Sequence, residues 1–369
     1  MQSVLDSLLC DDAEDGTLVV VSLDTLRARF APTRGYLNAA TCGLPLDGTV
    51  SALTEGIDRW SRAEHDLAGY DAAVTTSRAA FARIVGVPTA DVAVAAQTAA
   101  MVGMVATSLP AGAEVLTVEG DFTSVTYPFL TRTDLRVRAV PLAELADHVR
   151  PGTAAVALSL VQSRDGAIAD QDALVEAARR VGALTVVDLT PAAGWLPVDA
   201  SRFDVTVTSA YKWLCAPRGV TFLTAGPGAR SRLRPVHANW YAGADVWSSV
   251  YGHDPRLADD ARRFDLSPAW FCWLGAVPTL EAFAEELAGP DPDAVRRHDV
   301  ALADSLRAGL GLDPAGSAIV SVPDTDGTAG IRLARAGLKA AARGGSARLS
   351  FHVWNGEEDV AAATEALRG

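Results

Sequence analysis

Three short apolar runs rich in Val and Thr follow one another in the second half of the chain, at 184–187, 205–208 and 220–223. Each run is bounded by turn residues, which is typical of a strand buried in a sheet. Asp188 directly follows the first run, and Lys212 lies just beyond the second. Because ligands of a helix-covered sheet bind in the crevice outside the strand ends, we expect this carboxylate and this amine to share one crevice.

A lysine and an aspartate in one crevice match the needs of an aldehyde cofactor. The amine of Lys212 can form a Schiff base with an aldehyde. Pyridoxal phosphate also needs an anion beside its pyridine nitrogen, which Asp188 would supply, so that the ring can accept electrons from the substrate. The alternative is that Asp188 only ends a strand and that Lys212 lies on a surface loop. Spacing alone does not decide between the two.

The rest of the chain alternates between strand-like and helical segments. Residues 91–112 predict a strand, a tight turn and a helix, residues 113–129 predict a strand with an aromatic just beyond it, and DALVEAARRVGAL predicts an amphipathic helix ended by a glycine. Strands that alternate with such helices are typical of an α/β fold with a mostly parallel sheet. With 369 residues, 49% of them hydrophobic, the chain can form one large or two unequal domains.

Composition and spacing exclude several classes of function. The net charge is -13 and no run of Lys or Arg stands out, so nucleic acid and anionic membranes are poor candidate partners. Neither the four cysteines nor the six histidines have a metal-binding spacing, so we expect no metal site. The chain does not open on a signal-peptide pattern, and no apolar run approaches the ~20 residues of a membrane helix. We therefore expect a soluble, cytoplasmic protein.

The blocks VVD, AAGWLPVD and SAYKWLCAPRGVTFL, which hold the two candidate residues, resemble the class V aminotransferase group of fold-type-I pyridoxal phosphate enzymes. This group includes cysteine desulfurases, kynureninase and isopenicillin N epimerase-like proteins, and the resemblance extends from about Tyr36 to the C-terminus. It implies pyridoxal 5′-phosphate as the cofactor and a mostly parallel central sheet covered by helices. It also implies a large cofactor domain, 36–275, and a smaller α+β domain built from both termini, 1–35 and 276–369.

The resemblance also assigns contacts to the cofactor. In the group, the turn before a helix holds the phosphate, which places Thr98 and the Ala99 amide there; the alternative, that Thr98 is an N-cap, is compatible with phosphate binding. Phe122 would lie flat on the pyridine ring, although an aromatic after a strand usually belongs to the core. Gln162 and Ser163 would place a polar side chain against the ring oxygen. The implied cofactor-binding residues are Thr98, Ala99, Phe122, Gln162, Ser163, Asp188, Ser209, Tyr211 and Lys212.

Two further segments are expected to bind the substrate. RLSFHVWN resembles a block whose arginine, here Arg348, grips the α-carboxylate with its planar fork, and His352 in the same block is expected to serve in packing. YLNAATCGLP resembles a segment that enters the active site, with Asn38 and Ala39 lining the pocket. Without the resemblance, Arg348 would be a surface charge and 36–45 a strand that ends in a turn.

Two departures from the group limit what the resemblance implies. Most members have Gln or His three residues after the aspartate, whereas this chain has Pro191, which cannot donate a hydrogen bond. Either Gln162 supplies the lost contact or the electronics of the cofactor differ. Cysteine desulfurases use a nucleophilic cysteine shortly before the C-terminal arginine. Residues 324–348 contain none, which disfavours persulfide chemistry of that kind, and Cys42 is the cysteine nearest to the expected pocket.

Residues 231–275 are rich in large aromatics. In the group, this region crosses to the partner subunit and helps to form its active site, so the resemblance implies a homodimer with shared active sites. An ordinary aromatic core explains part of these residues as well.

The reaction expected from these assignments begins at the Cα of a small α-amino acid. The amino acid would displace Lys212 to give an external aldimine, and the freed amine would remove the Cα proton while Asp188 stabilises the pyridinium. Transamination, β- or γ-elimination such as C–S cleavage, and epimerisation share the resulting carbanion, and we expect an aminotransferase as the commonest outcome. A protein that binds pyridoxal phosphate without catalysis is the alternative of another class.

Overall fold

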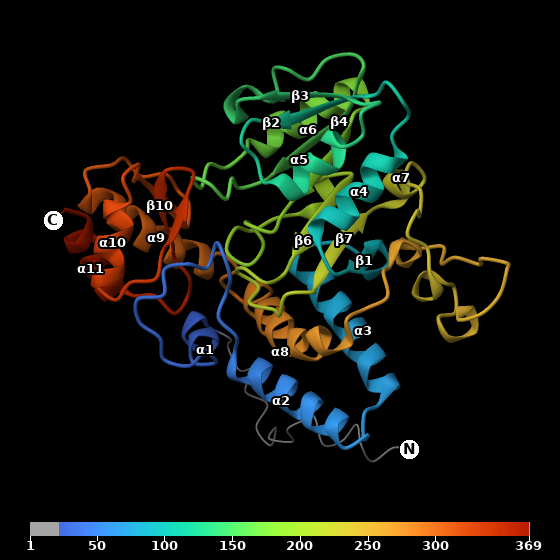
Figure 1. Cartoon of the computed structure of the whole chain (residues 1–369), viewed down its shortest axis with the longest axis horizontal. Helices are drawn as coiled ribbons and strands as arrows, with labels where there is room; N and C mark the ends of the chain where they lie inside the picture. The colour runs from blue at the N-terminus through green and yellow to red at the C-terminus, as the bar shows by residue number, and fades with distance from the viewer. Residues whose placement is uncertain (1–21, 369) are drawn as a thin grey trace.

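The computed structural model describes residues 22–368, and its centre is a seven-stranded sheet in the order β1-β7-β6-β5-β4-β2-β3 (Figure 1). All neighbouring strands are parallel except at β7, which runs antiparallel to both β1 and β6. The mostly parallel sheet of the sequence prediction is therefore confirmed. The strands are Val92–Ala95 (β1), Glu114–Val118 (β2), Arg136–Val140 (β3), Thr153–Ser159 (β4), Leu184–Asp188 (β5), Val205–Ser209 (β6) and Thr221–Ala225 (β7).

The three apolar runs of the sequence form β5, β6 and β7, side by side in the sheet. The direction of β7 follows from the segment 210–220 before it, which contains no helix. A parallel return needs a long crossover, usually a helix, whereas a short loop brings the chain back antiparallel. This loop carries Lys212, so the reversal of the chain between β6 and β7 places the lysine just beyond the carboxyl end of β6.

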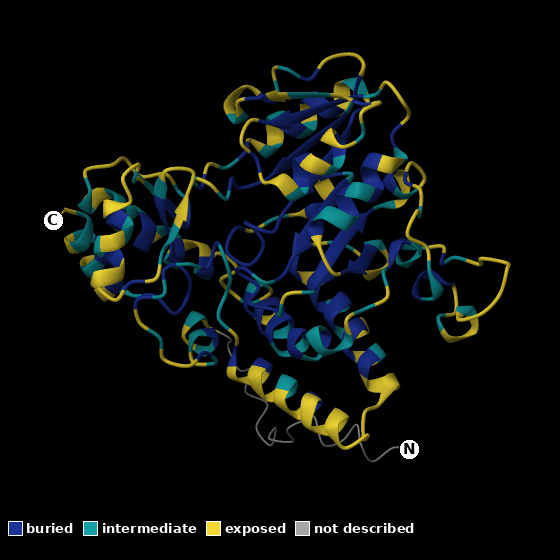
Figure 2. Cartoon of the chain, viewed as in Figure 1, coloured by how far each residue is buried: buried dark blue, intermediate teal, exposed yellow. Residues whose placement is uncertain are grey.

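Alternate side chains of the strands enter two separate cores, one on each face of the sheet. In β5, Val187 belongs to the core with α3, α6 and α8, and Val186 to the core with α4, α5 and α7. Because both faces are covered, the strands other than β3 are buried at nearly every position (Figure 2). The helices are Leu67–Ile84 (α3), Thr98–Ser108 (α4), Thr123–Leu130 (α5), Gln171–Val181 (α6), Pro227–Arg230 (α7) and Trp270–Leu287 (α8).

A second, three-stranded antiparallel sheet with the order β8-β10-β9 lies near the C-terminus and has a core of its own. Tyr36 and Asn38, from the start of the chain, form single bridges with Lys339 and Ser350 of this C-terminal unit. Residues from both ends of the chain thus build one small unit. Its elements are Ile319–Pro323 (β8), Ala341–Arg343 (β9), Ser346–Ser350 (β10), Ala294–Gly309 (α9), Thr328–Arg335 (α10) and Glu357–Arg368 (α11).

Helices α1 (Leu23–Arg27) and α2 (Asp47–Ser61) lead from the N-terminal segment to α3, and α2 packs along α8. The α8 helix runs without a break across residue 275, where the sequence places the boundary between the domains. The division at 275 stays a prediction, and residues 1–21 of the predicted small domain lie outside the described residues. Within 22–368, no helix combines the length and apolarity that a membrane crossing requires.

Candidate active site

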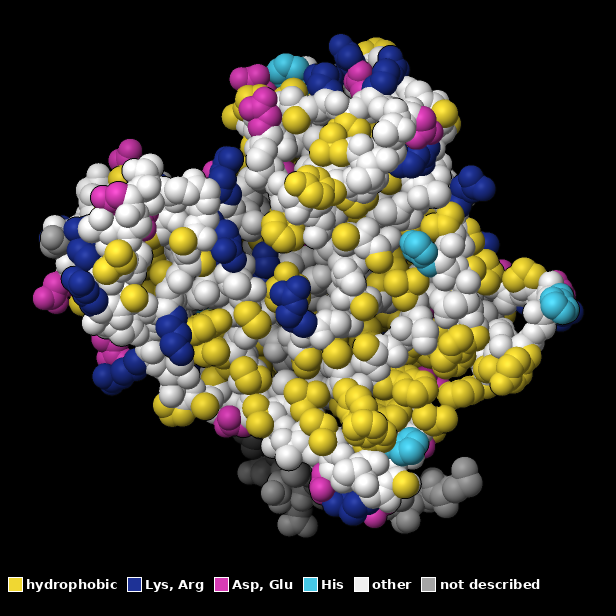
Figure 3. Space-filling view, viewed as in Figure 1, with side chains coloured by type: hydrophobic (Ala, Val, Ile, Leu, Met, Phe, Trp, Pro, Cys, Tyr) yellow, Lys and Arg dark blue, Asp and Glu magenta, His cyan; other side chains and the backbone are white. Residues whose placement is uncertain are grey.

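The carboxyl ends of β4, β5 and β6 bring the predicted aspartate and lysine to one edge of the sheet. Asp188 ends β5 and pairs in register with Ser159 at the end of β4, while Ser209 ends β6 and Lys212 follows in the loop to β7. Figure 3 shows a hollow between the large sheet and the C-terminal unit, with Lys and Arg side chains gathered around it. The site is therefore an electropositive crevice on a protein whose net charge is -13.

Asp188 is a buried carboxylate held by the chain that follows it. Its surface is 4% exposed, and its Oδ1 accepts a hydrogen bond from the backbone N–H of Thr190 at 2.9 Å. Burial raises the pKa of the carboxyl to about 6, although the Thr190 hydrogen bond and the charge of Lys212 act in the opposite direction. Among the described residues, the ion pairs with a buried carboxylate use Asp265, Glu114 and Asp299, and none uses Asp188. Asp188 is thus left for a cationic partner bound in the crevice.

Lys212 is a buried amine that faces the same crevice. It is 6% exposed, and its Nζ lies 5.7 Å from the centre of the Phe122 ring. Burial lowers the pKa of Lys212 to about 8, Asp188 opposes this shift, and the charges of Arg348 and other arginines add to it. A lysine with a lowered pKa carries a larger neutral fraction at physiological pH, which is the form that attacks a carbonyl carbon.

Close backbone approaches fix the loop that carries Lys212. The N–H of Gly43 donates to the carbonyl oxygen of Tyr211 at 2.8 Å, and a Cβ on Gly43 would lie 2.1 Å from the carbonyl oxygen of Lys212. On the other side, Nε2 of His352 donates to the carbonyl oxygen of Trp213 at 3.0 Å, because Nδ1 accepts from the N–H of Val353. Burial lowers the pKa of His352 to about 3, so the ring is neutral and serves in packing, as the sequence predicts.

Hydroxyl groups gather at the start of α4. The hydroxyls of Thr98 and Ser209 are 2.9 Å apart, and that of Thr221 lies 2.8 Å from Ser209. Thr98 is the first residue of α4, and Gln97 occupies the N-cap position, so the alternative role of Thr98 as the N-cap is wrong. With Ala99 in the same first turn, these hydroxyls and the helix N-terminus form a donor set suited to a phosphate group.

Tyr211 and Arg218 extend this group of donors. The guanidinium carbon of Arg218 lies 4.4 Å above the centre of the Tyr211 ring. Burial raises the pKa of the Tyr211 hydroxyl, so it is a neutral donor at physiological pH. Sequence reasoning named Tyr211 but missed Arg218, although it follows Pro217 in the same quoted block.

Asp121 holds the residues predicted to contact the cofactor ring. Its carboxylate accepts hydrogen bonds from the backbone N–H groups of Phe122 at 2.6 Å and Ser159 at 2.7 Å. It also accepts one from Nε2 of Gln162 at 3.2 Å, and this amide donates a second one to the Ser159 carbonyl oxygen at 3.0 Å. The Gln162 amide hydrogens are thus in use, and its contact with the cofactor stays a prediction. Phe122 is 46% exposed, so the alternative that its ring belongs to the hydrophobic core is wrong.

Sequence reasoning missed Asp121, although the strand-end rule that selects Asp188 also applies to it. It follows Gly120 just beyond β2.

Pro191 is the position at which this chain departs from the group. Its carbonyl oxygen accepts a hydrogen bond from Nε1 of Trp195 at 2.8 Å.

Arg348 is buried at the side of the crevice formed by β10. It is 2% exposed, so its interpretation as a surface charge is wrong. Its Nη1 donates to the backbone carbonyl oxygen of Ser163, its Nη2 donates to Oγ1 of Thr41 at 2.7 Å, and its Nε has no partner among the described residues. Burial and the charge of Arg343 lower the pKa of Arg348 to about 10. A buried guanidinium with an unused N–H fits an anionic ligand.

The segment 38–42 lies beside Arg348. Asn38 has a buried Oδ1 without a partner among the described residues, which a substrate amino group could satisfy. Ala39 is fully buried in the core, so its role as a pocket residue stays a prediction. Burial raises the pKa of the half-buried Cys42 thiol, which disfavours a thiolate nucleophile there.

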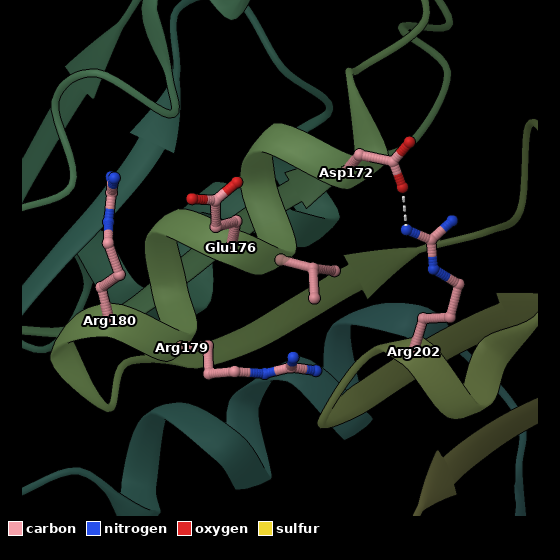
Figure 4. A pocket seen from close by; sticks show the side chains of 6 residues that line it. Asp172, Glu176, Arg179, Arg180 and Arg202 are labelled. Carbon is pink, nitrogen blue, oxygen red and sulfur yellow. Dashed lines mark hydrogen bonds and ion pairs between the residues drawn. The ribbon is translucent and has the colours of Figure 1, made fainter.

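A surface depression elsewhere contains none of the predicted site residues. It has a volume of about 370 Å³ and lies on the outer face of α6. Figure 4 shows Asp172 and Arg202 facing each other across it, and they form an ion pair in solvent. Such an exposed pair contributes little beyond surface charge.

The residues of the crevice fit pyridoxal phosphate on four separate counts. The amine of Lys212 and the carboxylate of Asp188 are buried without an ion-pair partner among residues 22–368, and a hydroxyl cluster lies at a helix N-terminus. An aromatic ring, that of Phe122, is exposed beside the amine. Lys212 would hold the aldehyde carbon, Asp188 the pyridine nitrogen, and Thr98 and Ser209 the phosphate.

Comparisons with known proteins point to the same class. Isopenicillin N epimerase of Streptomyces clavuligerus is 33% identical over 258 residues, which cover 63% of this chain and 63% of that protein. Isopenicillin N epimerase of Amycolatopsis lactamdurans is 28% identical over 347 residues, covering 79% of this chain and 84% of that protein. The chain thus spans less than two thirds of the first of these relatives. A cysteine desulfurase of Escherichia coli is similar in fold, with a TM-score of 0.78, 19% identity and coverage of 94% and 98%.

The sheet topology and the lysine–aspartate crevice define a fold-type-I pyridoxal phosphate enzyme family. Within it, the chain belongs to the aminotransferase class-V family, whose model matches residues 38–321. Pyridoxal 5′-phosphate is the cofactor of this protein, and a solved structure of similar fold, with a TM-score of 0.81, carries a covalent ligand on that cofactor. The resemblance drawn from the sequence is confirmed.

The burial of Lys212 predicts its reactivity as a function of pH. With the pKa lowered from 10.5 to about 8, the neutral amine should form as the pH rises from about 7 to 9. Competitive labelling of the cofactor-free protein with acetic anhydride, followed by mass spectrometry of the Lys212 peptide, measures this profile. A midpoint near 10.5 would show that the amine is not desolvated in solution.

Proposed function

We propose that the protein is an enzyme that acts on a small α-amino acid at its Cα, with transamination as the reaction. The observation that carries the proposal is the burial of the Lys212 amine, the Asp188 carboxylate and the Arg348 guanidinium around one crevice, and burial also lowers the pKa of Lys212 to about 8. An amine, a carboxylate and a guanidinium placed in this way can hold the cofactor at one end and an amino-acid carboxylate at the other.

Each residue has a defined task in this proposal. The bound cofactor supplies an electron sink for the charge that develops at Cα. Arg348 orients the α-carboxylate, Lys212 accepts the Cα proton on Nζ, and Asp188 keeps a proton on the pyridine nitrogen through its negative charge. Phe122 and the buried walls of the crevice exclude water from the reacting atoms.

The alternatives share the first proton transfer. A C–S or other β- or γ-eliminating lyase and an epimerase would need the same three residues, and relatives bear names of both kinds, isopenicillin N epimerase and cystine C-S lyase. A screen of amino acids, assayed separately for keto acid, ammonia and inversion at Cα, distinguishes the three reactions. A protein whose cofactor spectrum no amino acid changes would support the non-catalytic alternative instead.

Cysteine desulfurase activity stays among the alternatives. The sequence argument against it is the lack of cysteine in 324–348, but several structures of similar fold are cysteine desulfurases, so the likeness does not support the exclusion. Release of sulfide or persulfide from L-cysteine by the wild type and by Cys42→Ala tests whether a cysteine of this chain takes part.

The exposed aromatics support a homodimer with shared active sites. Trp60 and Ile57 on α2 are exposed, as are Trp247, Val250 and Tyr251 in the segment between β7 and α8. Figure 3 shows hydrophobic side chains spread broadly over the lower part of the face in view. Patches of this kind mark interfaces between subunits. We expect a dimer by light scattering, and a monomer with full activity would contradict the shared site.

The role of Arg348 predicts a substrate-dependent loss of activity. Because a lysine reproduces the charge but not the two-pronged fork, Arg348→Lys should weaken substrate capture, and Arg348→Ala should lower kcat/KM by about 30- to 1000-fold. The covalent attachment of the cofactor should persist in both variants, since Arg348 bonds to Ser163 and Thr41 and not to Lys212. Steady-state kinetics with an amino acid and with the matching amine that lacks the carboxylate measure the effect. Equal losses for both compounds would make Arg348 a structural residue.

A further inference from the structure

The hairpin of β9 and β10 carries two arginines on one face. Its register pairs Arg348 with Ala341 and Ser346 with Arg343, and the turn consists of Gly344 and Gly345 at φ +55 and +79. Such a two-residue turn with positive φ fixes the register of a hairpin. Because Arg343 and Ala341 alternate with one residue between them, the Arg343 side chain leaves the same face as that of Arg348.

Both guanidinium groups reach one neutral oxygen. Oγ1 of Thr41 lies 2.7 Å from Nη2 of Arg348 and 3.5 Å from Nη2 of Arg343. Neighbouring like charges on one face of a sheet destabilise it. Among the described residues, neither arginine has a carboxylate partner, whereas other arginines of the protein such as Arg78 do. Two close guanidinium groups without a carboxylate are the features of a site for anions.

The two arginines lie at different depths of the crevice. Arg348 is 2% exposed and close to the reactive amine, while Arg343 is exposed at the mouth. Both charges act on Lys212 and lower its pKa, as does the charge of Arg218. Arg218 stacks on Tyr211 at the phosphate side, so its charge is available to the cofactor phosphate. With Arg218 matched to the phosphate and Arg348 matched to the α-carboxylate, the positive charge of Arg343 is left without an anionic partner.

We propose that the substrate is an amino acid whose side chain carries a second acid group, which Arg343 binds while Arg348 binds the α-carboxylate. This inference rests on the proposed function of the same site. One carboxylate is satisfied by the fork of one guanidinium, so a second arginine implies a second anion. Because both arginines reach the same hydroxyl, the two acid groups must be close, as at the ends of a short carbon chain such as that of aspartate or glutamate.

Pairs of isosteric amino acids test the charge alone. We expect the wild-type holoenzyme to prefer L-glutamate over L-glutamine, or L-aspartate over L-asparagine, by about 10- to 100-fold in kcat/KM. Arg343→Gln should reduce that ratio to near one. The matched control is Arg335→Gln, which removes an exposed arginine of α10 and should keep the wild-type ratio.

A binding measurement that needs no turnover accompanies the kinetics. Glutarate has two acid groups but no amine, so it cannot react with the cofactor, and pentanoate has only one acid group. Calorimetry should show tighter binding of glutarate to the wild-type holoenzyme, and Arg343→Gln should remove the difference. Equal kcat/KM for the acidic and neutral amino acids, or an unchanged ratio in Arg343→Gln, would overturn the inference and leave the proposed function intact. If no amino acid of either kind changes the cofactor spectrum, the proposed function fails, and the inference with it.

Discussion

Lys212→Ala is expected to abolish turnover, with a loss of at least about 10³-fold, and to leave the protein without covalently attached cofactor. The expectation follows from the scarcity of amine side chains, because the chain contains only two lysines, Lys212 and Lys339. Lys212 is buried next to the ring of Phe122, whereas Lys339 is exposed and forms a single bridge with Tyr36. No second amine side chain is therefore available to replace the first one.

Lys339→Ala is the matched control, since it removes the other lysine and should change neither the cofactor content nor the rate. Small amines such as methylamine should partly restore the proton transfer of Lys212→Ala, because the space left by the side chain is large enough to admit them. Cofactor that remains covalently attached in Lys212→Ala, or turnover above one tenth of the wild-type rate, would remove Lys212 from the reaction.

Asp188→Asn is expected to retain the cofactor and to lose about 10²- to 10⁴-fold in kcat. The amide has the shape of the carboxylate and can still accept the hydrogen bond from the N–H of Thr190, so the fold of the loop should not change. The substitution removes the negative charge of Asp188. Protonation of the wild-type carboxyl, whose pKa is about 6, removes the same charge. The loss thus isolates the electrostatic role of this residue.

Asp188→Glu keeps the charge and should be milder than Asp188→Asn, although the longer side chain must fit into a buried site. Cofactor content, measured as phosphate released after denaturation, separates a failure to bind from a failure to react. An Asp188→Asn variant that turns over at the wild-type rate would show that the charge does not stabilise the cofactor nitrogen.

The features of the site that the sequence predicts are those that depend on local pattern. Asp188 and Lys212 follow apolar runs, and the ends of neighbouring strands in a parallel sheet meet at one edge. Arg348 was found only through the resemblance, because a lone arginine before an apolar run gives no sign of burial. The covering of both sheet faces likewise follows from the short runs rich in Val and Thr that form the buried strands β5, β6 and β7.

The features that the sequence does not predict depend on contacts between distant segments. Thr41 bonds to Arg348 because the start of the chain joins the C-terminal sheet, and no local pattern at either residue indicates this. Asp121 binds Gln162 across the ends of two strands, so the use of that amide could not be read from its own position. The proximity of Arg343 and Arg348 depends on the register of a three-residue strand, which propensity does not fix.

The most direct test of the central claim, that Lys212 binds pyridoxal 5′-phosphate, is borohydride reduction of the purified holoenzyme followed by proteolysis and mass spectrometry. Reduction turns the link between lysine and cofactor into a stable amine, and with only two lysines in the chain the two peptides cannot be confused. The structure predicts a reduced cofactor adduct on Lys212 and none on Lys339. An adduct on Lys339 alone, or no adduct on either lysine, would contradict the account.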